Sequence, residues 1–107
     1  MLDRIDLKKV KKELKDAWMP IDIVTVNDST VRIAKIQGEY HWHTHRYSDE
    51  FFLVQDGKMA IQTADGEVTL EQGQGLMVPK GTRHRSKSEK GAIALVFELQ
   101  ATRKEGD

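Results

Sequence analysis

The side chains of this sequence best suited to chemistry are its histidines, three of which stand close together. His41, His43 and His45 occupy alternate positions, Glu50 follows them, and the fourth histidine, His84, stands alone much later in the chain. In a β-strand, residues two apart point to the same face, so we predict three imidazoles on one side of a strand with a carboxylate close behind. Imidazole and carboxylate groups together bind divalent metals, so the first hypothesis is a metal site.

The donor atoms restrict which metals suit such a site. The set offers nitrogen and oxygen, and the chain contains no cysteine. This chemistry favours a divalent transition metal (Mn, Fe, Ni, Co or Zn) over copper(I) or an iron–sulfur cluster. Three imidazoles and one carboxylate leave one or two coordination positions open for water, a substrate or dioxygen. A single histidine on a strand is usually structural, but this alternation followed by a glutamate is a much rarer arrangement.

The three neighbouring histidines are not equivalent. At ~3.3 Å per residue, His43 and His45 lie about 6.6 Å apart along a strand, and their side chains can lean onto one ion. His41 shares their face but lies one step further along the chain. We therefore predict that His41 lies behind the ligands or at the rim of the site, with a ligand role as the alternative.

An N-terminal helix is predicted over residues 3–18, with Asp3 or Asp6 as its cap and Pro20 just beyond its end. Its apolar stripe recurs at steps of three and four: Leu7, Val10, Leu14 and Ala17 or Trp18. Lysines occupy the other face. Because 17 Lys and Arg balance 17 Asp and Glu in the whole chain, we expect that face to be solvated and to bind neither nucleic acid nor membrane.

After Pro20 the sequence predicts short β-strands separated by turn residues. Asp56-Gly57 and Asp65-Gly66 are typical of tight hairpin turns. Roughly eight or nine strands at this spacing favour a sandwich or a barrel. The predicted strands cover residues 21–26, 31–37, 40–45, 51–55, 58–63, 67–71, 75–78, 82–87 and 92–99.

The length of 107 residues suits one compact domain. We divide it into an N-terminal helical segment (1–19), a β barrel (20–100) and a charged C-terminal tail (101–107) that we expect to fray. No apolar run approaches the ~18 residues of a membrane span, and the first residues lack the apolar core of a signal peptide. With no cysteine, the expected location is the cytoplasm.

Two motifs of this chain resemble those of the cupin superfamily, in particular its small single-domain members. The first cupin motif is matched by Gly38, four residues, His43-Thr44-His45, four residues, Glu50, six residues and Gly57. The second is matched by Gly73, five residues, Pro79-Lys80-Gly81, two residues and His84. The first spacer is one residue shorter than usual, and Ser88 stands where the family commonly has asparagine.

The resemblance implies an all-β fold, a double-stranded β-helix or jelly-roll barrel, preceded here by the short N-terminal helix. It implies His43, His45, Glu50 and His84 as the metal ligands. It also implies a metal-dependent enzyme of the isomerase, epimerase or dioxygenase type acting on a small polar molecule. In such an enzyme Glu50 either stays a ligand or detaches and acts as a base. The alternative is a non-catalytic module that binds or senses a small ligand or metal.

Strand parity adds expectations about the two faces of the sheet. Counting inward from Glu50 and His84 places Phe52 and Ser86 on the wall of a pocket beside the metal, although ordinary core packing explains Phe52 equally well. The opposite parity turns Trp42, Phe51 and Leu53 outward. Large apolar side chains on that face need a cover, which either the helix or a second subunit could provide. Since cupins commonly pair through a sheet, the resemblance implies a homodimer.

Overall fold

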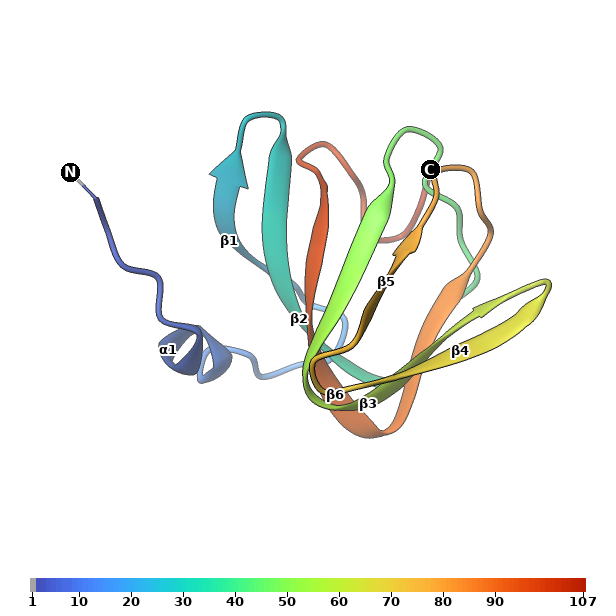
Figure 1. The fold of residues 1–107 in the computed structure, drawn as a ribbon, viewed down its shortest axis with the longest axis horizontal. Helices are drawn as coiled ribbons and strands as arrows, with labels where there is room; N and C mark the ends of the chain where they lie inside the picture. Colours follow the sequence, from blue (N-terminus) through green and yellow to red (C-terminus); the bar gives the residue numbers. More distant parts are fainter. Residues whose placement is uncertain (1) are drawn as a thin grey trace.

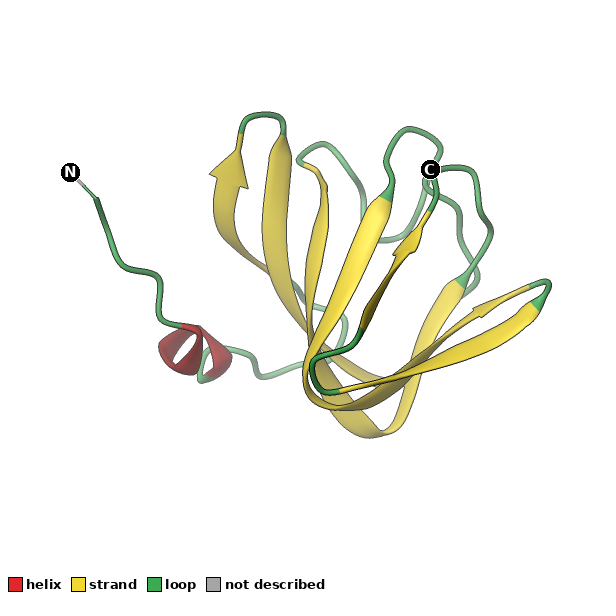
Figure 2. Cartoon of the chain, in the orientation of Figure 1, coloured by secondary structure: helices red, strands yellow, loops and turns green. Residues whose placement is uncertain are grey.

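The structure is a computed structural model that describes residues 2–107. It is built almost entirely from strands, with one short helix outside the sheet (Figures 1 and 2). The elements in chain order are α1 (Leu7–Lys11), β1 (Ile21–Val26), β2 (Ser29–Glu39), β3 (Glu50–Thr63), β4 (Gly66–Glu71), β5 (Gly75–Val78) and β6 (Arg85–Leu99). This architecture confirms the predicted all-β, jelly-roll fold class.

The strands form one antiparallel sheet that curves around a common interior (Figure 1). Its order is β1-β2-β6-β3-β4, and β5 pairs with the first part of β3. The long strands β3 and β6 are paired near the centre of this order, and β6 also pairs with β2, so segments far apart in the sequence lie side by side. The inner face carries the apolar core, which consists of Ala34, Ile36, Phe52, Val54, Met59, Ile61, Leu70, Val78, Ala92, Ala94 and Val96.

The Asp56-Gly57 hairpin turn is a prediction that the structure corrects. The chain runs through these residues within β3, and β6 likewise runs through the polar segment around Gly91. The two strands remain paired, with register shifts on both sides of Gly57. Gly57 has φ +77° and Gly91 has φ +102°, and a Cβ on Gly57 would collide with the carbonyl oxygen of Gly91. The glycines therefore form a bend in two paired strands, which merges predicted strands into fewer, longer ones.

The predicted helix over 3–18 is much shorter in the structure. Asp6 caps α1 through a 3.0 Å bond from the backbone N–H of Lys8, and regular helix ends at Lys11. Beyond it the chain makes single turns, with Leu14 N–H donating to the carbonyl of Lys11. The crowding of lysines one turn apart disfavours a longer helix in this segment. None of the helices among residues 2–107 is long and apolar enough to cross a membrane.

The C-terminal residues, which the sequence predicts to be frayed, make specific contacts with the rest of the chain. The Asp107 N–H donates to the carbonyl of Thr44 at 2.8 Å, and its carboxylate accepts from the backbone N–H of Arg46 at 2.9 Å. Gly106 lies against His43, so that a Cβ there would be 2.7 Å from the His43 Cβ. The end of the chain is therefore held against the histidine segment.

Candidate metal centre

The two histidine-bearing segments are joined by backbone hydrogen bonds. His43 and His84 form an isolated antiparallel bridge, with N–H to carbonyl distances of 3.0 and 2.9 Å. The N–H of Gly81 donates to the carbonyl of His45 at 2.8 Å. Glu50 is the first residue of β3, and His84 immediately precedes β6. The paired backbones thus fix the spacing of side chains that lie far apart in the sequence.

The expected continuous strand over 40–45 is not present, and this changes the position of His41. The Tyr40 N–H donates to the carbonyl of Ser86, and His43 pairs with His84. The chain therefore advances three residues from Tyr40 to His43, while the paired segment advances only two between His84 and Ser86. The extra residue breaks the alternation of faces, as a bulge does. The His41 side chain is exposed, and its Nε2 lies 2.9 Å from the carbonyl oxygen of Glu105. His41 therefore stands at the rim, outside the group formed by the other three histidines.

Four side chains converge inside the barrel. The ligand-type atoms of His43, His45, Glu50 and His84 all lie within 4.8 Å of one another. His45, Glu50 and His84 are buried, and His43 is half-buried. The His84 Nε2 is 3.1 Å from one Glu50 oxygen, and the His45 Nε2 is 3.5 Å from the other. This group of three imidazoles and one carboxylate could bind a metal ion.

Backbone carbonyls orient two of the imidazoles. The Nδ1 of His43 lies 2.9 Å from the carbonyl oxygen of His41, and the Nδ1 of His84 lies 2.9 Å from that of Thr82. A carbonyl only accepts, so each Nδ1 carries the proton. In the neutral rings, Nε2 then carries a lone pair that is directed at the interior. An outer hydrogen bond at Nδ1 prepares a histidine for a metal in this way. The carbonyl of His41 thus contributes to the site although its imidazole does not.

The donor set fits a cation at its centre. Both ring nitrogens of buried His45 lack a hydrogen-bond partner among the described residues, and an unpaired buried polar atom is costly. The lone pair on Nε2 of a neutral His84 faces an acceptor oxygen of Glu50, an arrangement that needs a proton or a cation between the two. A divalent transition metal would bind one nitrogen of His45 and would lie between His84 and Glu50, with imidazole and carboxylate donors.

The charge states of the group also suit metal binding. Burial lowers the pKa of His43 to about 4, and burial lowers the pKa of His45 as well, so both rings are neutral at pH 7. Burial opposes ionisation of Glu50, but hydrogen bonding to His84 and Glu98 outweighs it and holds the pKa of Glu50 below its usual value. Burial likewise opposes protonation of His84, yet Glu50 raises its pKa. His43 and His45 are therefore already in the neutral state that a metal requires, and His84 would release its proton on metal binding.

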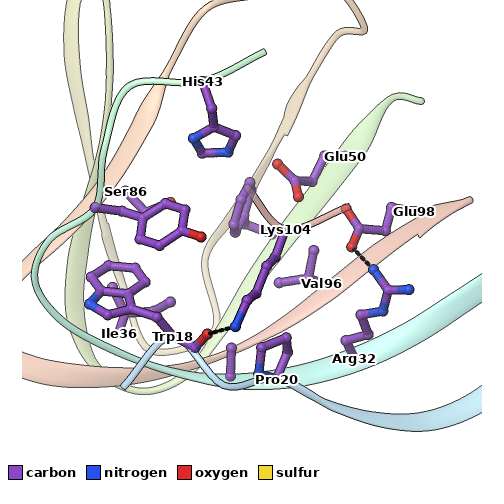
Figure 3. A pocket seen from close by; sticks show the side chains of 13 residues that line it. Trp18, Pro20, Arg32, Ile36, His43, Glu50, Ser86, Val96, Glu98 and Lys104 are labelled. Atoms are coloured by element: carbon purple, nitrogen blue, oxygen red, sulfur yellow. Dashed lines mark hydrogen bonds and ion pairs between the residues drawn. The ribbon is translucent and has the colours of Figure 1, made fainter. Parts of the chain in front are cut away.

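A cavity of about 70 Å³ adjoins His43 and Glu50 (Figure 3). Phe52 and Ser86, the two pocket residues predicted from strand parity, are buried and line it. Arg32, Tyr40, Glu98 and Lys104 also contribute polar groups to its wall. The apolar part of the lining comes from Trp18, Pro20, Ala34, Ile36, Phe52 and Val96.

The sequence reasoning missed a buried hydrogen-bonded pair, Arg32 and Glu98, in this wall. Arg32 Nη1 donates to Glu98 at 2.6 Å, and the two side chains are 11% and 4% exposed. Burial, followed by the nearby Glu50 carboxyl, raises the pKa of Glu98 to about 9. Arg32 is the one charged residue in the apolar segment 31–34, and Glu98 is the one charged residue in the apolar segment 92–99. Both stand at inward positions of their strands. That pattern was the available signal, since a charge facing a core needs a partner or a role.

Comparison with known proteins identifies the family. The family model described as the cupin domain matches residues 29–99. The chain belongs to the cupin family. The match spans β2 to β6 and includes all four members of the candidate metal group.

Individual relatives agree with this assignment. The cupin chain is 38% identical over 94 residues to the protein YdbB of Bacillus subtilis, a match that covers 87% of this chain and 83% of the relative. Among solved structures, the protein NMB1881 of Neisseria meningitidis is 34% identical with a TM-score of 0.83, over 92% of this chain and 100% of that one. A cupin-2 domain protein of Shewanella frigidimarina gives a TM-score of 0.87 at 28% identity, covering 90% and 94% of the two chains.

Proposed function

We propose that this cupin binds one divalent transition metal through His43, His45, Glu50 and His84 and acts on a small polar molecule in the adjoining cavity. The observation that carries the proposal is the convergence of these donors within 4.8 Å around a buried His45 whose two ring nitrogens have no hydrogen-bond partner among the described residues. Such a set suits Mn, Fe, Co, Ni or Zn.

Four protein donors leave one or two positions of a five- or six-coordinate metal open toward the cavity. A bound metal would polarise or activate a small molecule placed there. The chain itself supplies the orientation of the imidazoles, through the carbonyls of His41 and Thr82. Its apolar inner wall keeps the site poor in water, which strengthens electrostatic interactions within it.

An enzyme is favoured over a passive binding module because the cavity wall carries polar groups beyond the ligands. Glu98 and Tyr40 reach the same cavity as His43 and Glu50. A second carboxyl next to Glu50 offers a site where a proton can be held during isomerase, epimerase or dioxygenase chemistry. In this proposal Glu50 is a ligand first, and its detachment as a base is the alternative role.

Two measurements test the proposal in sequence. Metal analysis of the purified protein should find about one transition metal per chain. Turnover is then assayed with hydroxy-ketones, sugar phosphates and thiols on protein loaded with Mn, Fe or Ni. Turnover with any of these supports the enzyme. Metal bound at full stoichiometry with no turnover across the panel supports the binding module, and absence of metal binding contradicts both.

We also propose a homodimer formed through the outer face of the sheet. One apolar row crosses this face through paired residues of four strands, namely Met77, Phe51, Phe97 and Val31. Met77 is 50% exposed and Phe51 37% exposed. A second copy would cover such a row, as in symmetric dimers. Light scattering coupled to size exclusion should show a dimer that Phe51→Glu converts to a monomer, and a monomeric wild type would contradict it.

A further inference from the structure

Lys104 is a cation at the cavity that has no acidic partner. Its ammonium donates to the carbonyl of Trp18 at 3.0 Å and contacts the sulfur of Met19 at 3.3 Å. No carboxylate oxygen among residues 2–107 forms an ion pair with it. Figure 3 shows the side chain extending through the cavity region toward Trp18. Lys104 therefore offers a positive charge that neutral acceptors only partly satisfy.

Arg32, the other cation of the cavity wall, is bound through all three of its nitrogens. Its guanidinium donates to Asp22, to Glu98, and to the backbone carbonyls of Gln100 and Thr102. These bonds use four of its five N–H groups, and two carboxyl groups already face its charge. Lys104 has a free ammonium proton and a flexible stem, so it is the cation available to a bound anion.

Trp18 is held in a costly backbone conformation beside Lys104. Its φ is +65°, a left-handed value that is unfavourable for a bulky residue. Its N–H donates to the carbonyl of Lys35 at 3.0 Å, and its own carbonyl accepts from Lys104. The indole stacks on Tyr40 with ring centroids 4.7 Å apart. Backbone strain that is retained to place an aromatic ring in a cavity wall is typical of a binding site.

We propose that the cavity binds a small organic carboxylate, with its apolar or aromatic body against Trp18, Tyr40 and Phe52 and its anionic group on Lys104. This inference rests on the proposed function and specifies the ligand class of the same site. Arg32 is paired with Asp22 and Glu98, which leaves Lys104 against the Glu50 carboxylate at the cavity. A divalent metal would then leave a positive excess that an anion neutralises.

The size of the cavity limits the body of this ligand. One water takes up about 10–15 Å³ of a cavity volume measured in this way. The cavity of about 70 Å³ therefore holds roughly five waters, which occupy ~150 Å³ in the liquid. A dry cavity of about that size in another protein accepts one benzene ring. A single-ring or short branched acid therefore fits, and a sugar phosphate or a longer chain would have to extend out of the mouth.

A purely structural role for Lys104 gives a different expectation. If Lys104 only ties the C-terminal segment to Trp18, its removal lowers stability and leaves the cavity indifferent to ligand charge. If it selects an anion, its removal abolishes a preference between ligands of equal shape and different charge. Charge preference is therefore the quantity to measure.

The experiment uses Trp18 fluorescence in a Trp42→Phe protein, which leaves Trp18 as the remaining one of two tryptophans. The probes are benzoate and its neutral isostere benzamide, titrated into metal-free protein. We expect benzoate to quench at about tenfold lower concentration, the size of one charge-assisted hydrogen bond. Lys104→Met should remove the preference, and Lys104→Arg should keep most of it. Equal binding of both probes, no quenching by either, or a preference that survives in Lys104→Met would overturn the inference.

A parallel series on protein loaded with Mn or Ni separates this inference from the metal proposal. Metal content is measured for each variant and should not change with Lys104. If no metal binds but the Lys104-dependent preference is present, the metal proposal fails and the carboxylate site stands. If metal binds and the metal-free protein shows no preference, the carboxylate site fails alone.

Discussion

The cavity contains two carboxyl groups that are satisfied in different ways. Glu98 lies 2.6 Å from Arg32, a cation that the chain itself supplies and that uses four of its five N–H groups in hydrogen bonds. Glu50 lies among three histidines, two of which are neutral at pH 7 because burial lowers their pKa. The Glu98 corner therefore has its cation supplied by the chain, while the Glu50 corner has donors arranged for a cation from outside. The difference separates a structural charge cluster from a binding site within one small barrel.

Removing histidines that surround Glu50 should have the largest effect, which is the loss of metal binding. The double variant His43→Ala, His45→Ala is expected to lose stoichiometric metal binding. It should also lose the rise in thermal stability that added Mn or Ni produces, because a metal that binds only the native state stabilises that state. His41→Ala is the matched control, since its imidazole bonds to Glu105 outside the group. Metal analysis and melting curves with and without metal provide the readouts. Full metal content in the double variant would refute the ligand assignment.

Removing Arg32, the cation of the Glu98 corner, should destabilise the fold and leave metal binding unchanged. Arg32→Met leaves Glu98, Asp22 and two backbone carbonyls without their donor. We expect a loss of about 2–4 kcal/mol in the free energy of unfolding, measured by urea denaturation. Arg32→Lys keeps the positive charge but loses the planar set of guanidinium donors. Its free energy of unfolding should therefore lie between those of the wild type and Arg32→Met. Loss of metal with unchanged stability would reverse the roles of the two corners.

The pH dependence of the metal-free protein should reveal the neutral imidazoles. The pKa of His43 is about 4 in the folded protein and about 6.5 in an unfolded chain. The unfolded state therefore takes up the proton first, and His43 reduces stability as pH falls from about 6.5 to 4. His84, whose pKa is raised, acts in the opposite direction. Urea midpoints across this range should show a shallower acid loss in His43→Ala, and an unchanged slope would contradict the assignment.

The smallest effect is expected for Glu98→Gln. Because the pKa of Glu98 is about 9 in the metal-free protein, the side chain is already neutral at pH 7, and an amide keeps its shape and its bond to Arg32. The expected change in unfolding free energy is below about 1 kcal/mol. A loss as large as that of Arg32→Met would mean that Glu98 is ionised, and the two corners would then differ less than proposed.

The fold class and the converging group follow from local spacing, and this is why they could be predicted. His43 and His45 are two residues apart, and Pro79-Lys80-Gly81 leads the chain directly to His84. The sequence predicts His41 behind the ligands or at the rim, but not the break in alternation that puts it there, because one extra residue between Tyr40 and His43 is visible only once Ser86 and His84 are paired with them. Alternation is a rule for regular strands and fails at a bulge.

The rest of the cavity depends on tertiary contacts that no local pattern records. Arg32 and Glu98 are 66 positions apart and meet because β2 and β6 are neighbours. Lys104 reaches Trp18 across a similar distance in sequence. The Asp56-Gly57 pair has the composition of a hairpin turn, but its partner strand, with Gly91 opposite, makes it a bend. In each case the deciding neighbour lies more than 30 positions away in the sequence.

The packing of Gly106 on His43 has a consequence for how sequence variation in this protein is interpreted. Gly106 has φ +95°, and the backbone of Thr44 leaves no room for a side chain there. A saturation screen scored on metal retention should therefore report an intolerant position almost at the end of the chain, where tolerance is normally assumed. Replacing this glycine would act on the imidazole as directly as a change in the histidine loop itself.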